Sequence, residues 1–295
     1  MGDIAAAGFS EITETESQNN SVLRRFLRHR LAMAGSVVFT LVVVMAVFAS
    51  WIAPQDPYAV SRTFEAAPSA EHLLGTDLVG RDVLSRLIYG SRVSLLVGVG
   101  TVILCLAIGG LFGILAGYFG GRTDAVIMRF TDVIMSFPYF VVILVLVSIL
   151  GPAVSNVILS MGLLGWPGIA RIIRGSILSA KETDYVKAGR ALGFSDSRIV
   201  FRHIMPNILA PVLVNATFGV SNAILMESSL SFLGMGVQPP IASWGNILTD
   251  AQSIAILSRE PWLWVPAGLM IVVTVLSINF IGDGLRDALD PKKIQ

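Results

Sequence analysis

The sequence is short of charged residues. Only 14% of its 295 residues are Asp, Glu, Lys or Arg, against about a quarter in soluble globular proteins. By contrast, 54% are hydrophobic and the mean hydropathy is +0.74. This imbalance excludes an ordinary soluble domain and predicts a membrane protein with several spans. The formal net charge of +1 gives no positive field that would favour nucleic-acid binding.

Reactive side chains are also scarce. The single cysteine, Cys105, cannot form an intramolecular disulfide and is expected to be a small packing residue in an apolar run. No GxxxxGKS or GxxxxGKT phosphate loop occurs, so we expect no ATP hydrolysis by this chain. His29, His72 and His203 are scattered between the predicted sides of the membrane, which argues against a shared metal site. We therefore predict neither an enzyme nor a metal centre.

Hydrophobic segments long enough to cross a bilayer, which takes about twenty apolar residues, recur six times. The predicted spans are residues 31–53, 93–118, 130–150, 153–173, 207–233 and 262–281. Most of the 21 Lys and Arg residues then fall on the side of the two chain ends, which the positive-inside rule places in the cytoplasm. The predicted fold is an all-α membrane protein with six transmembrane helices and both termini cytoplasmic.

These spans suggest a division of the chain. We assign residues 1–23 to a disordered cytoplasmic tail and residues 24–92 to the first helix with an external segment. Residues 93–284 form a predicted five-helix core, and residues 285–295 a second cytoplasmic tail. Within the external segment, residues 81–88 have the spacing of a short amphipathic helix on the outer interface.

Glycine and proline predict contacts and bends in the spans. Gly109, Gly113 and Gly117 recur every four residues, a stripe that lets a neighbouring helix pack closely. Pro138 predicts a kink in the third span, and Pro167 a break in the fourth.

Polar residues inside the spans are candidates for a translocation path. A charge there is costly unless it faces protein or water, so we predict that Glu227 and the adjacent Ser228 line an outer gate. The alternative for Glu227 is a structural hydrogen bond between helices. Asn279 is predicted to pack between helices or to face the path. Arg129 and Asp132, three residues apart, are expected to pair.

A polar, basic island lies between the fourth and fifth spans. Residues 184–206 read DYVKAGRALGFSDSRIVFRHIMP, and we predict two short helices joined by a hinge. Asp184 or the residue before it can cap the first helix, and Gly193 can take the left-handed position that ends it. Ser195 or the residue after it can cap the second helix, and Pro206 suits the first turn of the next span.

One face of the first of these helices is apolar. Tyr185, Ala188 and Leu192 recur at helical spacing, and Gly189 is small enough to let another backbone approach. Such a stripe on a water-exposed loop is typical of docking into a groove of a partner protein. A loop folded against its own membrane domain is the equally favoured alternative.

Residues 184–206 resemble the EAA loop of permeases in ATP-driven (ABC) importers. Ala188, Gly193 and Pro206 fall on the pattern, whereas Lys187 stands at its Glu position and Gly189 at its second Ala. Three further segments are similar to the second permease of the dipeptide, oligopeptide and nickel importers: LGTDLVGRDVLSRLIYGSRVSL (74–95), ESSLSFLGMGVQPP (227–240) and GDGLRDALDP (282–291). The resemblance extends from about residue 24 to residue 291.

This resemblance implies the type I ABC importer architecture in a bacterial inner membrane. The expected cargo is a dipeptide or oligopeptide, with nickel chelates and glutathione as alternatives. The implied partners are a homologous second permease, one or two ATPases that hold ATP and magnesium, an extracytoplasmic substrate-binding protein and membrane lipid. This chain is expected to hold no cofactor. A secondary transporter, for which we find no internal repeat, and a non-transporting membrane scaffold remain as alternatives.

The resemblance also implies which residues couple the permease to its ATPases. They are Asp184, Tyr185, Lys187, Ala188, Gly189, Arg190, Leu192, Gly193, Arg198 and Pro206. Gly193 is the expected hinge, and Lys187 and Arg190 are the expected salt-bridge donors to an ATPase.

Overall fold

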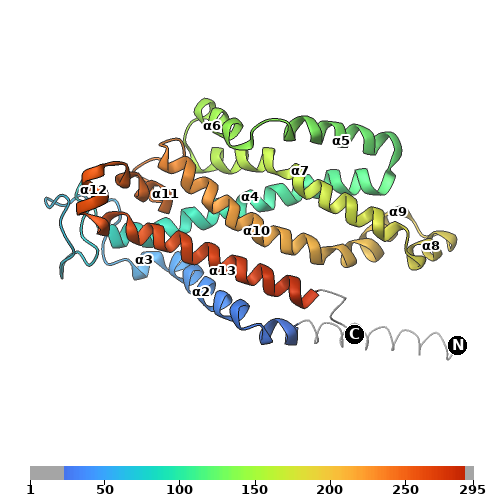
Figure 1. Ribbon diagram of the computed structural model, residues 1–295, viewed down its shortest axis with the longest axis horizontal. Helices are drawn as coiled ribbons and strands as arrows, with labels where there is room; N and C mark the ends of the chain where they lie inside the picture. The colour runs from blue at the N-terminus through green and yellow to red at the C-terminus, as the bar shows by residue number, and fades with distance from the viewer. Residues whose placement is uncertain (1–22, 290–295) are drawn as a thin grey trace.

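The computed structural model describes residues 23–289 as helices joined by loops (Figure 1). Within that range, the isolated bridge between Thr76 and Asp82 is the one β-type pairing. Five helical segments are long and apolar enough to cross a membrane, and a bent helix pair brings the number to as many as six. These features confirm the predicted all-α membrane fold.

The elements follow one another along the chain as a series of long helices with short ones at the turns. In order they are α2 (Arg30–Val47), α3 (Ala49–Ile52), α4 (Val83–Phe119), α5 (Gly121–Met135), α6 (Tyr139–Leu150), α7 (Val154–Lys181), α8 (Asp184–Ala191), α9 (Asp196–Arg198), the π-helical η1 (Ile199–Ile204), α10 (Met205–Phe232), α11 (Trp244–Ile247), η2 (Leu248–Gln252), α12 (Ile254–Arg259), η3 (Pro261–Leu263) and α13 (Val265–Leu289).

The predicted third span is the bent pair. Helices α5 and α6 meet at 81°, and Pro138 stands at the N-cap of α6 with extended backbone angles. Proline disfavours the α-helical conformation of the residue before it and donates no N–H, so the helix ends there. The predicted kink is therefore a complete break between two helices.

Several predicted boundaries are wrong. Residues 81–88 do not form a separate helix, because α4 begins at Val83 and continues through the proposed boundary at residue 92. Asp82 caps this helix, accepting a 2.8 Å hydrogen bond from the backbone N–H of Ser85. Helix α7 passes through Pro167 without a break. Helix α13 extends to Leu289, into the predicted tail, whereas residues 1–22 and 290–295 lie outside the described residues.

The packing of α4 against α7 confirms the predicted glycine stripe. A Cβ atom on Gly109 would lie 2.7 Å from the carbonyl oxygen of Trp166, and one on Gly113 would lie 2.8 Å from that of Ala170. A Cβ on Gly117 would lie 2.9 Å from the Cβ of Ile177. The two backbones are thus close enough that only glycine fits at these positions of α4.

Two ion pairs join α5 to α7. Asp124 accepts hydrogen bonds of 2.5 Å from Nε and Nη2 of Arg174, and Asp132 accepts one of 2.6 Å from Nη2 of Arg171. The partner of Asp132 is therefore on α7, and the predicted pairing with Arg129 is wrong. Arg171 on the neighbouring helix α7, and not Arg129 on α5 itself, supplies the guanidinium that pairs with Asp132.

The two ends of the bundle differ. The start of α2, the end of α13 and the short helices α8 and α9 lie at one end, while α3, α11 and α12 lie at the other (Figure 1). Nε2 of His29 and Oδ2 of Asp287 are 3.8 Å apart at the first end. The first and last described helices therefore begin and end on the side that carries the loop 184–206.

Gly113 provides a test of the close helix packing. We expect Gly113→Ala to lower the free energy of unfolding by about 1 to 3 kcal/mol, because the added methyl overpacks the contact with α7. The matched control is Gly110→Ala, since the nearest atom to its Cβ would be Cδ1 of Ile173 at 4.0 Å. Thermal unfolding of the purified protein in detergent measures both. Equal effects would show that the glycine contact does not limit stability.

Candidate functional site

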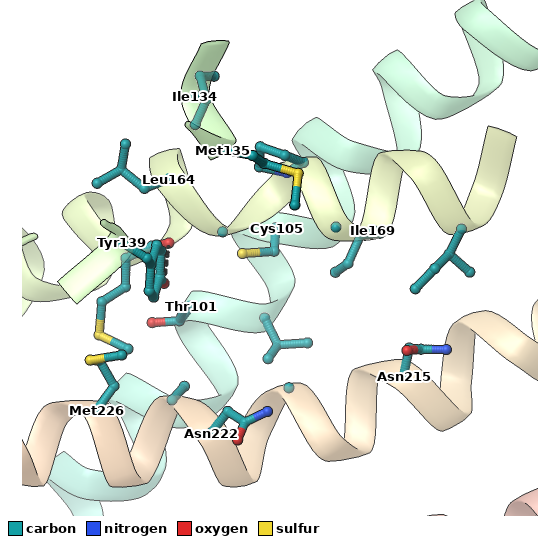
Figure 2. Close-up of a pocket in the computed structure, with 18 of the residues that line it drawn as sticks. Thr101, Cys105, Ile134, Met135, Tyr139, Leu164, Ile169, Asn215, Asn222 and Met226 are labelled. Atoms are coloured by element: carbon teal, nitrogen blue, oxygen red, sulfur yellow. Dashed lines mark hydrogen bonds between the residues drawn. The ribbon is translucent and has the colours of Figure 1, made fainter. Parts of the chain in front are cut away.

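A cavity of about 420 Å³ lies between α4, the junction of α5 and α6, α7 and α10 (Figure 2). Most of its wall is apolar, with a few polar groups. The lining residues include Thr101, Cys105, Met135, Tyr139, Met161, Leu164, Gly165, Ile169, Asn215, Gly219, Asn222 and Met226. Four helical segments that are far apart in the sequence therefore contribute to one chamber.

The α10 wall of the cavity is a regular stripe. Asn215, Gly219, Asn222 and Met226 are spaced four, three and four residues apart, which places them on one helix face. Both asparagines are exposed. A carboxamide in the middle of a membrane-spanning helix costs free energy against lipid, so this face requires water or protein beside it. The spacing is visible in the sequence, but our prediction of path residues missed it.

The cavity wall is rich in flexible thioethers. Met135, Met161 and Met226 come from three different helices, and the single thiol, Cys105, joins them. Met side chains adapt readily to differently shaped neighbours. The hydroxyl of Tyr139 donates a 3.0 Å hydrogen bond to the backbone carbonyl of Met161, whereas Oγ1 of Thr101 is buried and has no hydrogen-bond partner in the described part of the chain. The wall thus combines a soft apolar surface with a few hydrogen-bonding groups.

The described cavity wall has few reactive side chains. No group of three or more metal-ligating His, Cys, Asp or Glu side chains occurs among residues 23–289. The lining residues contain no carboxylate, imidazole or amine, so the described part of the chamber has no general base beside a nucleophile.

Glu227 lies behind this cavity and not in its wall. Its side chain is fully buried and accepts hydrogen bonds from the hydroxyls of Ser231 (2.7 Å), Ser243 (2.8 Å) and Ser94 (3.5 Å). Ser228 is buried and donates to the carbonyl of Ile224. This geometry is the structural hydrogen bond that we weighed as the alternative to a gate.

Asn279, the third predicted path residue, is also away from the chamber. It lies half-buried on α13, a helix that contributes no residue to the cavity wall. The three predicted path residues therefore lie outside the chamber, while Met226, the residue before Glu227, lines it.

Glu227 and the serine hydroxyls around it form one end of a longer polar network. Asn246 and Ser243 form a capping box at the start of α11, and Oδ1 of Asn246 accepts a 3.4 Å hydrogen bond from Arg86. Arg86 lies 3.4 Å from the carboxylate of Asp77. The network joins the segment before α4 to α10 and the segment after it, so this end of the bundle is held by buried polar contacts.

The loop 184–206 has the two predicted short helices. Gly193 adopts a φ of +75° after α8. Its N–H donates to the carbonyl of Arg190, and the N–H of Phe194 donates to that of Gly189, both at 3.0 Å. These two bonds form a Schellman motif, in which the left-handed position favours glycine. Oγ of Ser195 then accepts a 3.4 Å hydrogen bond from the N–H of Arg198, confirming the predicted cap.

The second helix does not end before the next span. The segment Asp196–Phe232 is continuous, and the π-helical turn η1 connects α9 to α10. Pro206 lies in the first turn of α10, as predicted. Because the turn before it is π-helical, the missing N–H of Pro206 falls where the regular α-helical bonding pattern is already interrupted.

The loop has a buried face and an exposed face. Val186, Ile199 and Ile204 are buried in a cluster with Ile173 and Ile177 of α7. The opposite face leaves three residues exposed, namely Tyr185, Ala188 and Leu192. The loop therefore folds against its own domain, whereas docking of the exposed stripe into a partner stays a prediction.

Gly189 is not part of that exposed stripe. It is buried, and a Cβ there would lie 3.2 Å from Cδ2 of Phe194. The prediction that Gly189 belongs to the docking surface is therefore wrong. Its small size serves the packing of Phe194, which the Schellman turn folds back over α8.

Tyr118, at the end of α4, anchors the loop. Its hydroxyl donates a 2.5 Å hydrogen bond to Asp196, and its backbone carbonyl accepts one of 2.7 Å from Lys181. The Nζ of Lys181 and the guanidinium of Arg190 each lie 5.6 Å from the centre of its ring. Tyr118 is not predicted from the sequence, because the residue types around it do not indicate contacts with residues about seventy positions away.

Two further cations of the loop, Lys187 and Arg198, have local partners. Lys187 is 3.2 Å from Glu182, and both side chains are mostly exposed, so this pair contributes under about 1 kcal/mol. The guanidinium of Arg198 lies 4.0 Å from the centre of the Phe194 ring. Lys187 is therefore accessible from solvent, whereas Arg190 is turned toward Tyr118.

Comparison with known proteins gives consistent matches. Residues 109–295 match the family described as binding-protein-dependent transport system inner membrane component. Residues 17–70 match the N-terminal transmembrane domain of oligopeptide transport permease C.

Relatives of known name cover nearly the whole chain. A putative peptide permease of Brucella suis is 44% identical over 91% of this chain and 89% of its own length. The oligopeptide transport system permease protein OppC of Bacillus subtilis is 39% identical over 99% and 97%. Among solved structures, the inward-facing MetNI methionine ABC transporter matches with a TM-score of 0.58 and 20% identity, covering 70% of this chain and 96% of that one. The last match supports the fold alone.

The polar network around Arg86 and Asp77 predicts a pH dependence. Burial, together with the nearby Asp77, raises the pKa of Asp250 to about 6, above the unfolded value of about 3.9. The stability contributed by protonated Asp250 is therefore present below about pH 4 and is lost as the pH rises through about 6. We expect the midpoint of thermal unfolding to fall between pH 4 and pH 7, and Asp250→Asn to reduce that fall. Asp56→Asn, at an exposed position of the same region, should leave the fall unchanged, and identical pH profiles in both variants would contradict the assignment.

Proposed function

The chain belongs to the family of binding-protein-dependent transport system inner membrane components, the permeases of ABC importers, and we propose that it forms half of the translocation path of a peptide importer. The cavity carries this proposal. Its asparagine stripe is exposed although other helices of this chain form the remaining walls, which suits a chamber that a second permease subunit would complete. The names of its relatives favour peptides as the cargo.

The cavity wall suits a peptide in chemical terms. Asn215 and Asn222 offer carboxamides, which both donate and accept hydrogen bonds and so match the peptide backbone. The Met side chains of the cavity wall tolerate side chains of different shape. A nickel chelate or glutathione remains the alternative cargo, although the wall contains no acidic or imidazole ligand for a metal.

The partners follow from the family and from what this chain does not contain. Its sequence has no phosphate-binding loop, so ATP and magnesium belong in separate ATPase subunits. A homologous second permease would complete the path, and an external substrate-binding protein would deliver the cargo. The loop 184–206 and both chain ends would face the cytoplasm, in agreement with the distribution of basic residues.

The loop 184–206 is proposed to couple transport to ATP hydrolysis. Tyr185, Ala188 and Leu192 would dock into a groove of the ATPase, and Lys187 would exchange its exposed pair with Glu182 for an acidic group there. Tyr118 and the buried cluster attach the loop firmly to α4 and α7, so a displacement of the docked face reaches the membrane helices. The ATPase must contact the loop with different free energies in its two states, or it could not shift the permease.

Substitution of the asparagine stripe tests the path. We expect Asn222→Leu to reduce peptide uptake at least tenfold, because it removes a hydrogen-bonding group from the proposed path. Asn279→Leu is the matched control, since Asn279 lies outside the cavity, and it should retain uptake. Radiolabelled peptide uptake, normalised to the amount of assembled complex, measures the effect. Normal uptake in Asn222→Leu, or loss only in Asn279→Leu, would contradict the proposed path.

Substitution at the hinge tests coupling. We expect Gly193→Val to leave the protein in the membrane but to uncouple ATPase activity from transport, because valine is strained at a φ of +75°. Gly234→Val is a close control, since Gly234 has a φ of +76° after α10 and bonds of the same Schellman type, at the other end of the bundle. ATP hydrolysed per peptide transported should rise in the first variant only. A rise in both would show a general loss of stability.

A further inference from the structure

An apolar groove of about 390 Å³ lies between α2 and α4. Helix α2 lies on the other side of the bundle from α5 and α6, which contribute to the cavity (Figure 1). Phe39, Val43, Ala46 and Val47 follow one face of α2. Leu95, Leu96 and Val99 follow the facing side of α4, and Arg92 is the single charged residue of the lining. Exposed fractions of 62% for Val47 and 57% for Leu96 show that the groove is open to its surroundings.

Arg92 lies at one end of the groove and is partly committed to the backbone of α2. Its Nε donates a 2.5 Å hydrogen bond to the carbonyl of Ala46, and its Nη2 donates one of 2.8 Å to that of Val47. The ring centre of Tyr89 is 5.0 Å from its guanidinium carbon. These contacts fix the position of the guanidinium.

The positive charge of Arg92 has no carboxylate partner among residues 23–289. Its Nη1 makes no hydrogen bond within that part of the chain. A fixed guanidinium with a free edge is well suited to a phosphate oxygen.

The groove runs along the helices away from this charge. From Val47 to Phe39 the wall of α2 extends over eight residues, or about 12 Å along the axis. On α4, Leu95, Leu96 and Val99 continue from Arg92 in the same direction, toward the middle of the helix. Because α2 and α4 are both membrane-spanning candidates, the groove points from a membrane surface into the hydrocarbon.

We propose that this groove binds one glycerophospholipid, with an acyl chain along α2 and α4 and the phosphate on Arg92. A cation at one end of a long apolar channel complements a molecule that has an anionic head and an apolar tail. A free phosphate ion would leave the apolar walls unused. A helix of a second protein subunit is the competing occupant, and the experiment below distinguishes it from lipid.

The test uses native mass spectrometry of the complete importer complex, extracted in mild detergent from its own membrane. We expect the wild-type complex to retain a phospholipid through detergent washing, and Val99→Trp, which fills the groove, to lower that retention at least tenfold. Leu111→Trp is the matched control, because Leu111 is similarly exposed on α4 but lies outside the groove. Arg92→Gln should also lose the lipid, and Arg92→Lys should recover part of it.

Two results would overturn the proposal. The first is equal phospholipid retention in Val99→Trp and Leu111→Trp. The second is a photo-crosslinker at Leu96 that reacts with another protein subunit in place of lipid. Because Val99→Trp leaves Arg92 and its bonds to α2 intact, loss of lipid in that variant would not reflect a displaced α2. Phospholipid retention is measured without a transport assay, so its result is separate from the test of the proposed function.

Discussion

The close contact between α4 and α7 is the constraint on which the other parts of this permease depend. Three glycines of α4 let the two backbones meet at distances that any side chain would prevent. With the axes so close, Thr101 and Cys105 of α4 and Met161 of α7 reach the same chamber. At the end of this contact, Tyr118 and Lys181 meet under the loop 184–206. The cavity and the anchoring of the loop are therefore two results of one packing interface.

The polar groups of the membrane-spanning helices differ in whether this chain supplies them with hydrogen-bond partners. Glu227 is surrounded by serine hydroxyls that satisfy it inside the protein, so it stabilises the junction of α4, α10 and α11. Asn215 and Asn222 instead are exposed on the cavity face of α10. Nδ2 of Asn215 donates to the carbonyl of Pro211 on the same helix, and both side chains keep acceptor oxygens that favour water or a polar partner beside them. Burial thus separates the polar groups that are satisfied inside the protein from those that stay exposed.

The sequence was sufficient for features that depend on local chemistry. The apolar spans, the glycine stripe and the left-handed Gly193 follow from residue type and spacing, and the structure agrees with each. It was insufficient where distant segments meet. The partner of Asp132 is on α7, Tyr118 binds Asp196 across the loop, and the cavity combines four helical segments. Glu227 was judged by its charge alone, because the serines that satisfy it come from α4, α10 and the segment before α11.

The length of α4 has a mechanical consequence. Its 37 residues make a rod of about 55 Å, nearly twice the roughly 30 Å thickness of the hydrocarbon core. Arg86 holds one end within the polar network, and Tyr118 holds the other under the loop. A tilt of about 5° around the middle of such a rod moves its ends by roughly 2 Å in opposite directions. A movement of one end of α4 at one membrane surface therefore produces an equal movement of its other end, in the opposite direction, at the other surface. No helix has to bend or unfold for this to happen.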